Sequence, residues 1–338
     1  MKRIAIIGAG SWGTALAVVA ARSGHEVRLW SRSDEVATSI NSHRFNPSYL
    51  TSTAIPNGVF ATCDFDATLS GASLVLLATP SHVARGVLIN MASRLEQDSI
   101  IVSVSKGIEI ESGKRISQIV REVAGENFSH QFVCLSGPSF AKEVVDDHPT
   151  AIVAASVDLE AARVVQAELS FQNLRIYTNN DVVGTELGGS VKNVMAIAAG
   201  MATGLGFGSN SIAALITRGL AEITRLALQE GAQRDTLMGL AGLGDLVLTC
   251  TGRLSRNRFV GEELGKGKTL EEVSGELSEV AEGIKTALAV KRLADRANLE
   301  MPITNQVKAV LYDGKPPRDA VVELMGRPLR EEGGSEIR

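Results

Sequence analysis

The run Arg3-Ile-Ala-Ile-Ile7 is followed at once by Gly8-Ala-Gly-Ser-Trp-Gly13, and this stretch decides the fold. The apolar run predicts a buried strand, and the residues from Thr14 to Arg22 predict a helix that stops at Ser23-Gly24. A second strand is expected over Val27 to Trp30. A strand, Gly-x-Gly-x-x-Gly, a helix and a strand within about thirty residues form the context that a dinucleotide fingerprint requires.

Each glycine of this fingerprint has a separate physical task. Gly8 permits the tight turn, Gly10 lets backbone N–H groups approach a pyrophosphate, and Gly13 allows the helix to pack closely on the strand. The positive end of the helix dipole then faces the phosphates. The stretch therefore predicts a site for NAD(H) or NADP(H), with Ser11 and Trp12 inside the turn.

The chain continues with alternating strands and helices. Further strands are expected at Leu74 to Ala78, Ile100 to Ser105, Phe132 to Leu135, Ala151 to Ala155 and Arg175 to Thr178, with helices such as Val83 to Leu95 and Lys114 to Val123 between them. This order predicts an α/β fold with a Rossmann-type, doubly wound, mostly parallel sheet. Ligands bind outside the carboxyl ends of such strands, where Lys106 and the turn from Ser136 to Ser139 lie. A solvated loop lysine is the alternative for Lys106.

Strand signals end near Asn179-Asn180-Asp181, and long helical stretches follow. They include Thr185 to Gly204, Ser211 to Glu230, Leu270 to Glu272, Ile284 to Asn298 and Pro302 to Tyr312. We therefore expect a dinucleotide-binding domain over residues 1–180 and an all-helical substrate and catalytic domain over residues 181–338.

Lys192 is the only charged residue between Glu186 and Arg218. The apolar spacing around it predicts a helix that is hydrophobic on all sides and hence buried. A buried ammonium either finds partners or loses proton affinity, which suits proton transfer near neutral pH. The alternatives are a structural lysine that satisfies helix carbonyls, or one whose stem reaches the surface.

Two further clusters in the second half point to chemistry. Asp245 is the only charge between Asp235 and Arg253, so it should seek a cation such as Lys192, or else cap the following helix. In the run Arg253-Leu-Ser-Arg-Asn-Arg258, arginine beside hydroxyl and amide donors suits a phosphate. A solvated basic loop is the alternative meaning of that run.

Composition excludes several other classes of protein. With 338 residues, 44% of them hydrophobic, the chain is long enough for two domains. A net charge of −4 gives no footprint for nucleic acid. Three cysteines and five histidines show neither a disulfide framework nor metal-ligand spacing, so no metal is expected. The N-terminus superficially resembles a secretory signal, but its glycines and second strand argue against one. No apolar span suits a membrane, and we expect a cytoplasmic protein.

Taken together, these motifs resemble bacterial NAD(P)-dependent glycerol-3-phosphate dehydrogenases. The resemblance covers essentially the whole chain. Its motifs are Gly8 to Gly13, Ser136-Gly-Pro-Ser-Phe-Ala-Lys-Glu143, Glu186-Leu-Gly-Gly-Ser-Val-Lys-Asn193, Ala213 to Glu222, Leu240 to Thr251, Ser255-Arg-Asn-Arg258, Val280-Ala-Glu-Gly283 and Met325-Gly-Arg-Pro328. The resemblance implies reversible hydride transfer between NAD(P)H and dihydroxyacetone phosphate, which gives sn-glycerol 3-phosphate for phospholipid synthesis.

The resemblance also implies roles for single residues. Lys192 would be the general acid and base, oriented with the substrate by Lys106 and Asp245, with Asn193 and Thr249 in support. The substrate phosphate would be held by Ser255, Arg256 and Asn257, with Gly137 and Ser139 from the first domain. Cofactor contacts would come from Gly8, Gly10, Ser11, Trp12, Gly13, Arg32, Ser33, Lys106, Ala141, Arg256, Val280 and Glu282.

The end of the second strand, Trp30-Ser-Arg-Ser33, lacks the acid that would bind a ribose 2′-hydroxyl. Arg32 and Ser33 would instead accommodate a 2′-phosphate, so NADPH is expected to be preferred, although nearby Asp34 leaves NAD(H) open. Two alternatives remain: a related dehydrogenase of a hydroxy acid or sugar acid, and a nucleotide sensor without catalysis. The partners expected are a small-molecule substrate and, with the oligomeric state left open, a second copy in a homodimer.

Overall fold

The computed structural model describes residues 1–276, 280–329 and 331, and in this part of the chain one sheet has eight strands in the order β3-β2-β1-β4-β5-β6-β7-β8. The strands are β1 (Arg3–Ile7), β2 (Glu26–Trp30), β3 (Val59–Thr62), β4 (Leu74–Leu77), β5 (Ile100–Ser103), β6 (Phe132–Ser136), β7 (Thr150–Ala155) and β8 (Leu174–Asn179). Neighbouring strands are parallel except for β6 and β7. The predicted doubly wound, mostly parallel sheet is confirmed.

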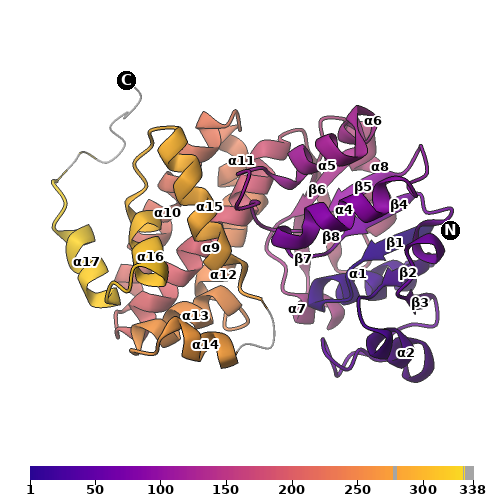
Figure 1. The fold of residues 1–338 in the computed structure, drawn as a ribbon, viewed down its shortest axis with the longest axis horizontal. Coiled ribbons are helices and arrows are strands. Elements are labelled where there is room, and N and C mark those ends of the chain that lie inside the picture. Colours follow the sequence, from indigo (N-terminus) through magenta and orange to yellow (C-terminus); the bar gives the residue numbers. More distant parts are fainter. Residues whose placement is uncertain (277–279, 330, 332–338) are drawn as a thin grey trace.

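Helices cover both faces of the sheet (Figure 1). One layer contains α1 (Ser11–Arg22), α2 (Asp34–His43), α7 (Ala141–Val145) and α8 (Leu159–Leu169), and the other contains α3 (Phe65–Leu69), α4 (Ala84–Ala92), α5 (Ile116–Ala124) and α6 (Glu126–His130). Alternate residues of a strand point to opposite faces. In β1, Ile4 and Ile6 therefore belong to the first apolar layer, whereas Ala5 and Ile7 belong to the second.

The second half of the chain is helical and packs around one central helix, α9 (Figure 1). Its helices are α9 (Val182–Gly204), α10 (Ser209–Gln229), α11 (Arg234–Met238), α12 (Asp245–Thr251), α13 (Arg256–Gly265), α14 (Leu270–Glu276), α15 (Glu282–Arg296), α16 (Pro302–Tyr312) and α17 (Pro317–Met325). Asp181 caps α9, because its carboxylate accepts a hydrogen bond from the Gly184 N–H at 2.8 Å. None of the described helices has both the length and the apolar character needed to cross a membrane.

The edge strand β3 is the element of the sheet that the sequence does not predict. It is four residues long, and it leaves Phe60 45% exposed at the edge. A short strand with one exposed aromatic side chain carries little of the apolar signal that identifies buried strands. It is nevertheless held by parallel pairing with β2, in which Val27 lies opposite Val59.

Glycines allow α9 and α13 to pack backbone against backbone. A Cβ atom added to Gly200 of α9 would lie 2.0 Å from the carbonyl oxygen of Arg258. A Cβ atom added to Gly261 of α13 would lie 1.9 Å from the carbonyl oxygen of Ile197. Because Lys192 lies on α9 and Arg256 begins α13, this packing fixes the distance between those two side chains.

The variant Gly261→Ala should separate α13 from α9, since the added methyl group meets backbone that cannot rotate away. We expect a loss of about 3 kcal/mol in the free energy of unfolding, measured by urea denaturation. The matched control is Gly275→Ala in α14, where an added Cβ has no neighbour within 4 Å. The control should be neutral or slightly stabilising, and equal losses in the two variants would contradict the close packing.

Candidate active site

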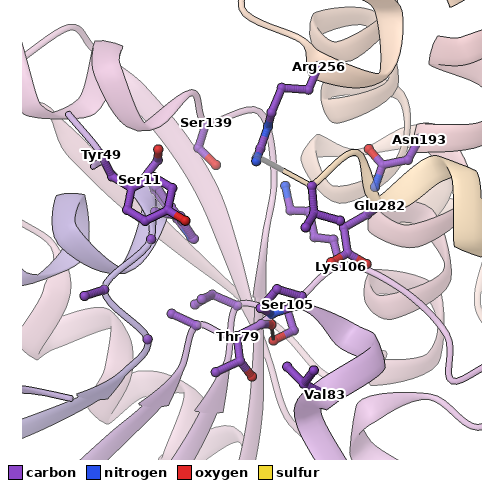
Figure 2. A pocket seen from close by; sticks show the side chains of 18 of the residues that line it. Ser11, Tyr49, Thr79, Val83, Ser105, Lys106, Ser139, Asn193, Arg256 and Glu282 are labelled. Atoms are coloured by element: carbon purple, nitrogen blue, oxygen red, sulfur yellow. Dashed lines mark hydrogen bonds between the residues drawn. The ribbon is translucent and has the colours of Figure 1, made fainter. Parts of the chain in front are cut away.

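A cavity of about 640 Å³ lies between the carboxyl ends of the strands and the helical half. Figure 2 shows Arg256 reaching into it from the helical side, with Ser11 and Ser139 on the sheet side. Most of the residues proposed from the sequence line it: Gly8, Gly10, Ser11, Trp12, Arg32, Ser33, Lys106, Ser139, Lys192, Asn193, Asp245, Thr249, Ser255, Arg256, Asn257, Val280 and Glu282. One cavity thus brings together residues that are as far apart in the sequence as Gly8 and Glu282.

The turn between β1 and α1 forms one end of this cavity. Gly8 has φ +120°, and a Cβ atom on it would lie 2.6 Å from the carbonyl oxygen of Ala78. A Cβ atom on Gly13 would collide with the carbonyl oxygen of Gly8 at 1.9 Å, so Gly13 serves the packing of α1 on β1. Gly10 is the N-cap residue of α1, provides no side-chain cap, and would have no neighbour within 4 Å of an added Cβ atom. A glycine turn followed by a helix N-terminus without a side-chain cap fits a dinucleotide pyrophosphate, because backbone N–H groups and the helix dipole face the phosphates.

The end of β2 forms the next part of the wall. Arg32 is exposed and lines the cavity, and Ser33 caps α2 through its hydroxyl, which accepts a hydrogen bond from the Val36 N–H at 3.4 Å. Asp34 lies beside Cys63. Burial and a hydrogen bond with Asp34 raise the pKa of the Cys63 thiol to about 11. The acid that the sequence left open for a ribose hydroxyl therefore lies beside a cysteine, and it is not among the described residues that line the cavity.

Lys192 and Lys106 share the carboxylate of Asp245. Lys192 Nζ donates to Asp245 Oδ1 at 2.6 Å and to Thr249 Oγ1 at 2.7 Å. Lys106 Nζ donates to Asp245 Oδ2 at 2.6 Å and to the carbonyl oxygen of Gly137 at 3.2 Å. The Lys192 side chain is 7% exposed and that of Asp245 1%. Lys192 therefore neither snorkels nor binds helix carbonyls, and Lys106 is not a solvated loop lysine.

This arrangement changes the acidity of Lys192. Burial lowers the pKa of Lys192 from its ordinary 10.5 to about 8. The charge of Asp245 opposes that change, and the charge of Lys106 adds to it. An ammonium group with such a pKa can exchange a proton near neutral pH, which is the property required of a general acid and base.

A π-helical turn, Leu240–Gly244, lies immediately before Asp245 and α12. The turn packs on α9, where a Cβ atom added to Gly188 would lie 2.7 Å from the carbonyl oxygen of Ala241. Such turns are rare and occur frequently at functional sites. Asp245 is the first residue of α12, and no side chain caps that helix. Two roles are predicted for Asp245 from the sequence, pairing with a cation and capping of the following helix, and the structure shows the pairing.

The run from Ser255 to Arg258 is the start of helix α13 and not a solvated loop. Ser255 Oγ accepts a hydrogen bond from the Arg258 N–H at 3.2 Å and so caps the helix. Asn257 Nδ2 donates to Asn193 Oδ1 at 3.0 Å, and Asn257 Oδ1 accepts from the Gly283 N–H at 2.8 Å. Asn257 thus ties α13 to α9 and α15, and Arg256 is the member of the run whose charge faces the cavity (Figure 2).

Three residues proposed from the sequence are not among the described residues that line the cavity. Gly13 packs α1 on β1, and Ala141 begins α7. Gly137 takes part through its carbonyl oxygen, which accepts from Lys106, and its φ of +140° requires glycine against Ile152. Of the three, Gly137 is the one that contacts a side chain of the site, through its backbone.

Glu282 closes the opposite wall by bridging the two halves of the chain. Its carboxylate accepts hydrogen bonds from Ser81 Oγ at 2.6 Å and from the Ser81 N–H at 3.3 Å. Burial raises the pKa of Glu282, and these hydrogen bonds oppose the rise. Val280, 44% exposed, lines the cavity just before α15.

Several lining residues are not proposed from the sequence, among them Tyr49, Thr79 and Ser105, which Figure 2 labels. Thr79 and Ser105 lie just beyond β4 and β5, where the topological rule for parallel sheets could have found them. Tyr49 belongs to an irregular segment, and only the three-dimensional structure brings it to the cavity.

Comparison with known proteins gives matches over the same residues. Residues 3–162 match the model of the NAD-dependent glycerol-3-phosphate dehydrogenase N-terminus, and residues 181–322 match that of the C-terminus. The glycerol-3-phosphate dehydrogenase (NAD(P)+) of Koribacter versatilis is 52% identical over 98% of this chain and 99% of that protein. That of Geobacter sp. (strain M21) is 49% identical with the same coverage.

A solved structure agrees with these matches. The crystal structure of glycerol-3-phosphate dehydrogenase from Coxiella burnetii superposes with a TM-score of 0.92. It is 40% identical and covers 96% of this chain and 99% of that one. Two family models cover both halves of the chain, and the relatives are similar along their whole length. The chain therefore belongs to the NAD-dependent glycerol-3-phosphate dehydrogenase family.

Proposed function

We propose that this chain catalyses reversible hydride transfer between NAD(P)H and dihydroxyacetone phosphate, which gives sn-glycerol 3-phosphate. The observation that carries the proposal is the buried Lys192, which shares Asp245 with Lys106 inside a cavity that also contains the glycine turn and Arg256. The names of the relatives support both the substrate and the cofactor. A spectrophotometric assay of NADPH and NADH oxidation with dihydroxyacetone phosphate tests it, and no turnover with either cofactor would contradict it.

Lys192 performs the proton transfer in this proposal. A reduced nicotinamide, when bound, supplies the hydride. In reduction the Lys192 ammonium donates a proton to the carbonyl oxygen, and in oxidation the neutral amine accepts the hydroxyl proton. Asp245 holds the amine in place, and Lys106 stabilises negative charge that develops on the oxygen. Both directions are accessible because the pKa of Lys192 is about 8.

The start of α13 is the site that we propose for the substrate phosphate. Arg256 supplies a planar fork that matches two phosphate oxygens, and the helix N-terminus adds its dipole. Ser139 lies across the cavity on the sheet side (Figure 2). A dehydrogenase of an unphosphorylated hydroxy acid is the second candidate, since a carboxylate also fits the fork of Arg256. The names of the relatives favour the phosphorylated substrate. Turnover of hydroxy acids without turnover of dihydroxyacetone phosphate would favour the second candidate.

We keep three further predictions of the sequence as proposals. The first is the division into a dinucleotide-binding domain up to residue 180 and a substrate domain beyond it. The second is a cytoplasmic location, and the third is a homodimer. Domain-wise expression, fractionation and light scattering, respectively, test them.

Replacing Lys192 by alanine should lower turnover about 100- to 10,000-fold, because the proton donor is lost. In the wild type, dihydroxyacetone phosphate reduction should fall as the pH rises through about 8, and glycerol 3-phosphate oxidation should rise over the same range. Both dependences should vanish in Lys192→Ala, while cofactor binding, followed by NADPH fluorescence, persists. Lys291→Ala, which removes a surface lysine paired with Asp295, is the control. Wild-type turnover in Lys192→Ala would defeat the assignment.

Replacing Arg256 by alanine should raise the KM for dihydroxyacetone phosphate about 10- to 100-fold, since a charged hydrogen-bonded contact is lost. Steady-state kinetics measure it. Arg253→Ala is the matched control, because Arg253 is exposed and lies outside the cavity lining. A fall in kcat with an unchanged KM would place the phosphate elsewhere.

We also propose that NADPH is the preferred cofactor, because Arg32 and Ser33 follow β2 and line the cavity, whereas Asp34 is not among the described lining residues. Arg32→Ala should then lower the ratio of kcat/KM for NADPH to that for NADH about tenfold. Arg28→Ala, a change within β2 where the guanidinium lies over the Phe60 ring, should leave the ratio unchanged. Equal losses with both cofactors in Arg32→Ala would reject the preference.

A further inference from the structure

Residues 104–115 connect β5 to α5, and although all of them are described they form neither helix nor strand. Lys106 lies near the start of this connecting segment, and Arg115 is its last residue, directly before α5. Its internal backbone hydrogen bonds lie beyond Lys106: the Glu109 N–H donates to the Lys114 carbonyl oxygen at 3.0 Å, and the Gly113 N–H donates to that of Glu109 at 2.8 Å. The position of Lys106 therefore depends on how the segment is attached to the rest of the protein.

Both ends of the connecting segment contact α9. Near its start, the stem of Lys106 lies against Gly189, where an added Cβ atom would be 3.8 Å from Lys106 Cδ. At its end, Arg115 Nη1 donates to Glu186 Oε2 at 2.7 Å. The same carboxylate caps α5, because it accepts from the Ser117 N–H at 2.8 Å and from Ser117 Oγ at 2.5 Å.

Glu186 and Lys192 lie on the same helix, six residues and about 9 Å apart along its axis. The side chains of Glu186 and Arg115 are 5% and 12% exposed, so their ion pair is shielded from solvent. We infer that Glu186 is a positioning residue, which holds the connecting segment on α9 and thereby keeps Lys106 on the carboxylate that it shares with Lys192. The inference rests on the proposed function of that site.

The segment also has attachments to elements other than α9. Next to Lys106, the Ser105 hydroxyl contacts the carbonyl oxygens of Thr79 at 2.6 Å and Leu77 at 3.2 Å at the end of β4. Arg85 of α4 binds Glu109 at 2.8 Å through two nitrogens, and Arg292 and Arg296 of α15 donate to the carbonyl oxygens of Ile110 and Ser112. These contacts hold the middle of the segment to helices that do not carry Lys192. The pair of Glu186 with Arg115 is the attachment to the helix that does.

Glu186→Gln tests the inference, because it keeps the size of the side chain and removes the charge that binds Arg115. If Lys106 moves away from Asp245, kcat for glycerol 3-phosphate oxidation should fall at least about tenfold. The charged and titratable groups that act on Lys192 are Asp245 and Cys250 of α12 and Lys106. Since the charge of Lys106 lowers the pKa of Lys192, that pKa should rise in the variant.

The pKa of Lys192 can be followed without turnover. Competitive acetylation of the cofactor-free protein over the neutral to alkaline range, analysed by mass spectrometry, gives the midpoint of Lys192 directly. A purely structural role of Glu186 would lower stability without moving this midpoint. Glu222→Gln is the matched control: Glu222 is also a buried carboxylate that caps a helix, with the Ile303 N–H at 2.6 Å, but it lies on α10. The midpoint of Lys192 in Glu222→Gln should equal that in the wild type.

Arg115→Lys is the milder second variant, because it keeps the charge and loses the guanidinium fork. It should shift the Lys192 midpoint in the same direction as Glu186→Gln, by less, and it decides the test if Glu186→Gln does not fold. A wild-type midpoint in the folded variants would overturn the inference. A wild-type enzyme that does not oxidise glycerol 3-phosphate would instead contradict the proposed function, and the acetylation midpoints would still test the positioning.

Discussion

One buried carboxylate, shared by two lysines, is the interaction on which the site depends. Asp245 is 1% exposed, and each of its oxygens accepts a hydrogen bond of 2.6 Å from a different ammonium group. Buried charges persist only when they are paired and hydrogen-bonded. The cluster carries one negative and two positive charges, so it retains an excess positive charge that suits an anionic substrate. The same imbalance, together with burial, is what keeps the pKa of Lys192 near 8.

This cluster joins two halves of the chain. Lys106 comes from the segment after β5, Lys192 from α9, and Asp245 from the start of α12. Glycines at the helix contacts let the backbones approach, and Glu282 binds Ser81 across the same boundary. The ends of the parallel strands supply the dinucleotide turn at the other side of the cavity. The cavity is thus built where an α/β sheet ordinarily binds ligands, and the helical half adds the proton donor.

Features that depend on local sequence could be predicted, and those that depend on distant contacts could not. The sheet could be predicted from the glycine turn at Gly8 and from the alternation of strands with helices. Close backbone approach requires glycine, and buried strands require apolar runs, so both can be recognised in the sequence. Lys192 stood out as a lone charge in an apolar helix. The strand β3 and the side chain of Tyr49 left no such mark. The choice of partner for Asp245 stayed open for the same reason, since Lys192 and Lys106 lie 53 and 139 residues away from it along the chain.

The most direct test of the shared carboxylate is an NMR titration of the protein with ¹³C-labelled lysine ε-carbons. The resonance that disappears in Lys192→Arg identifies Lys192. It should titrate with a midpoint near 8, and the midpoint should move lower in Asp245→Asn, because the carboxylate raises the pKa of Lys192. A midpoint at the ordinary lysine value of 10.5, unaffected by Asp245→Asn, would contradict the account.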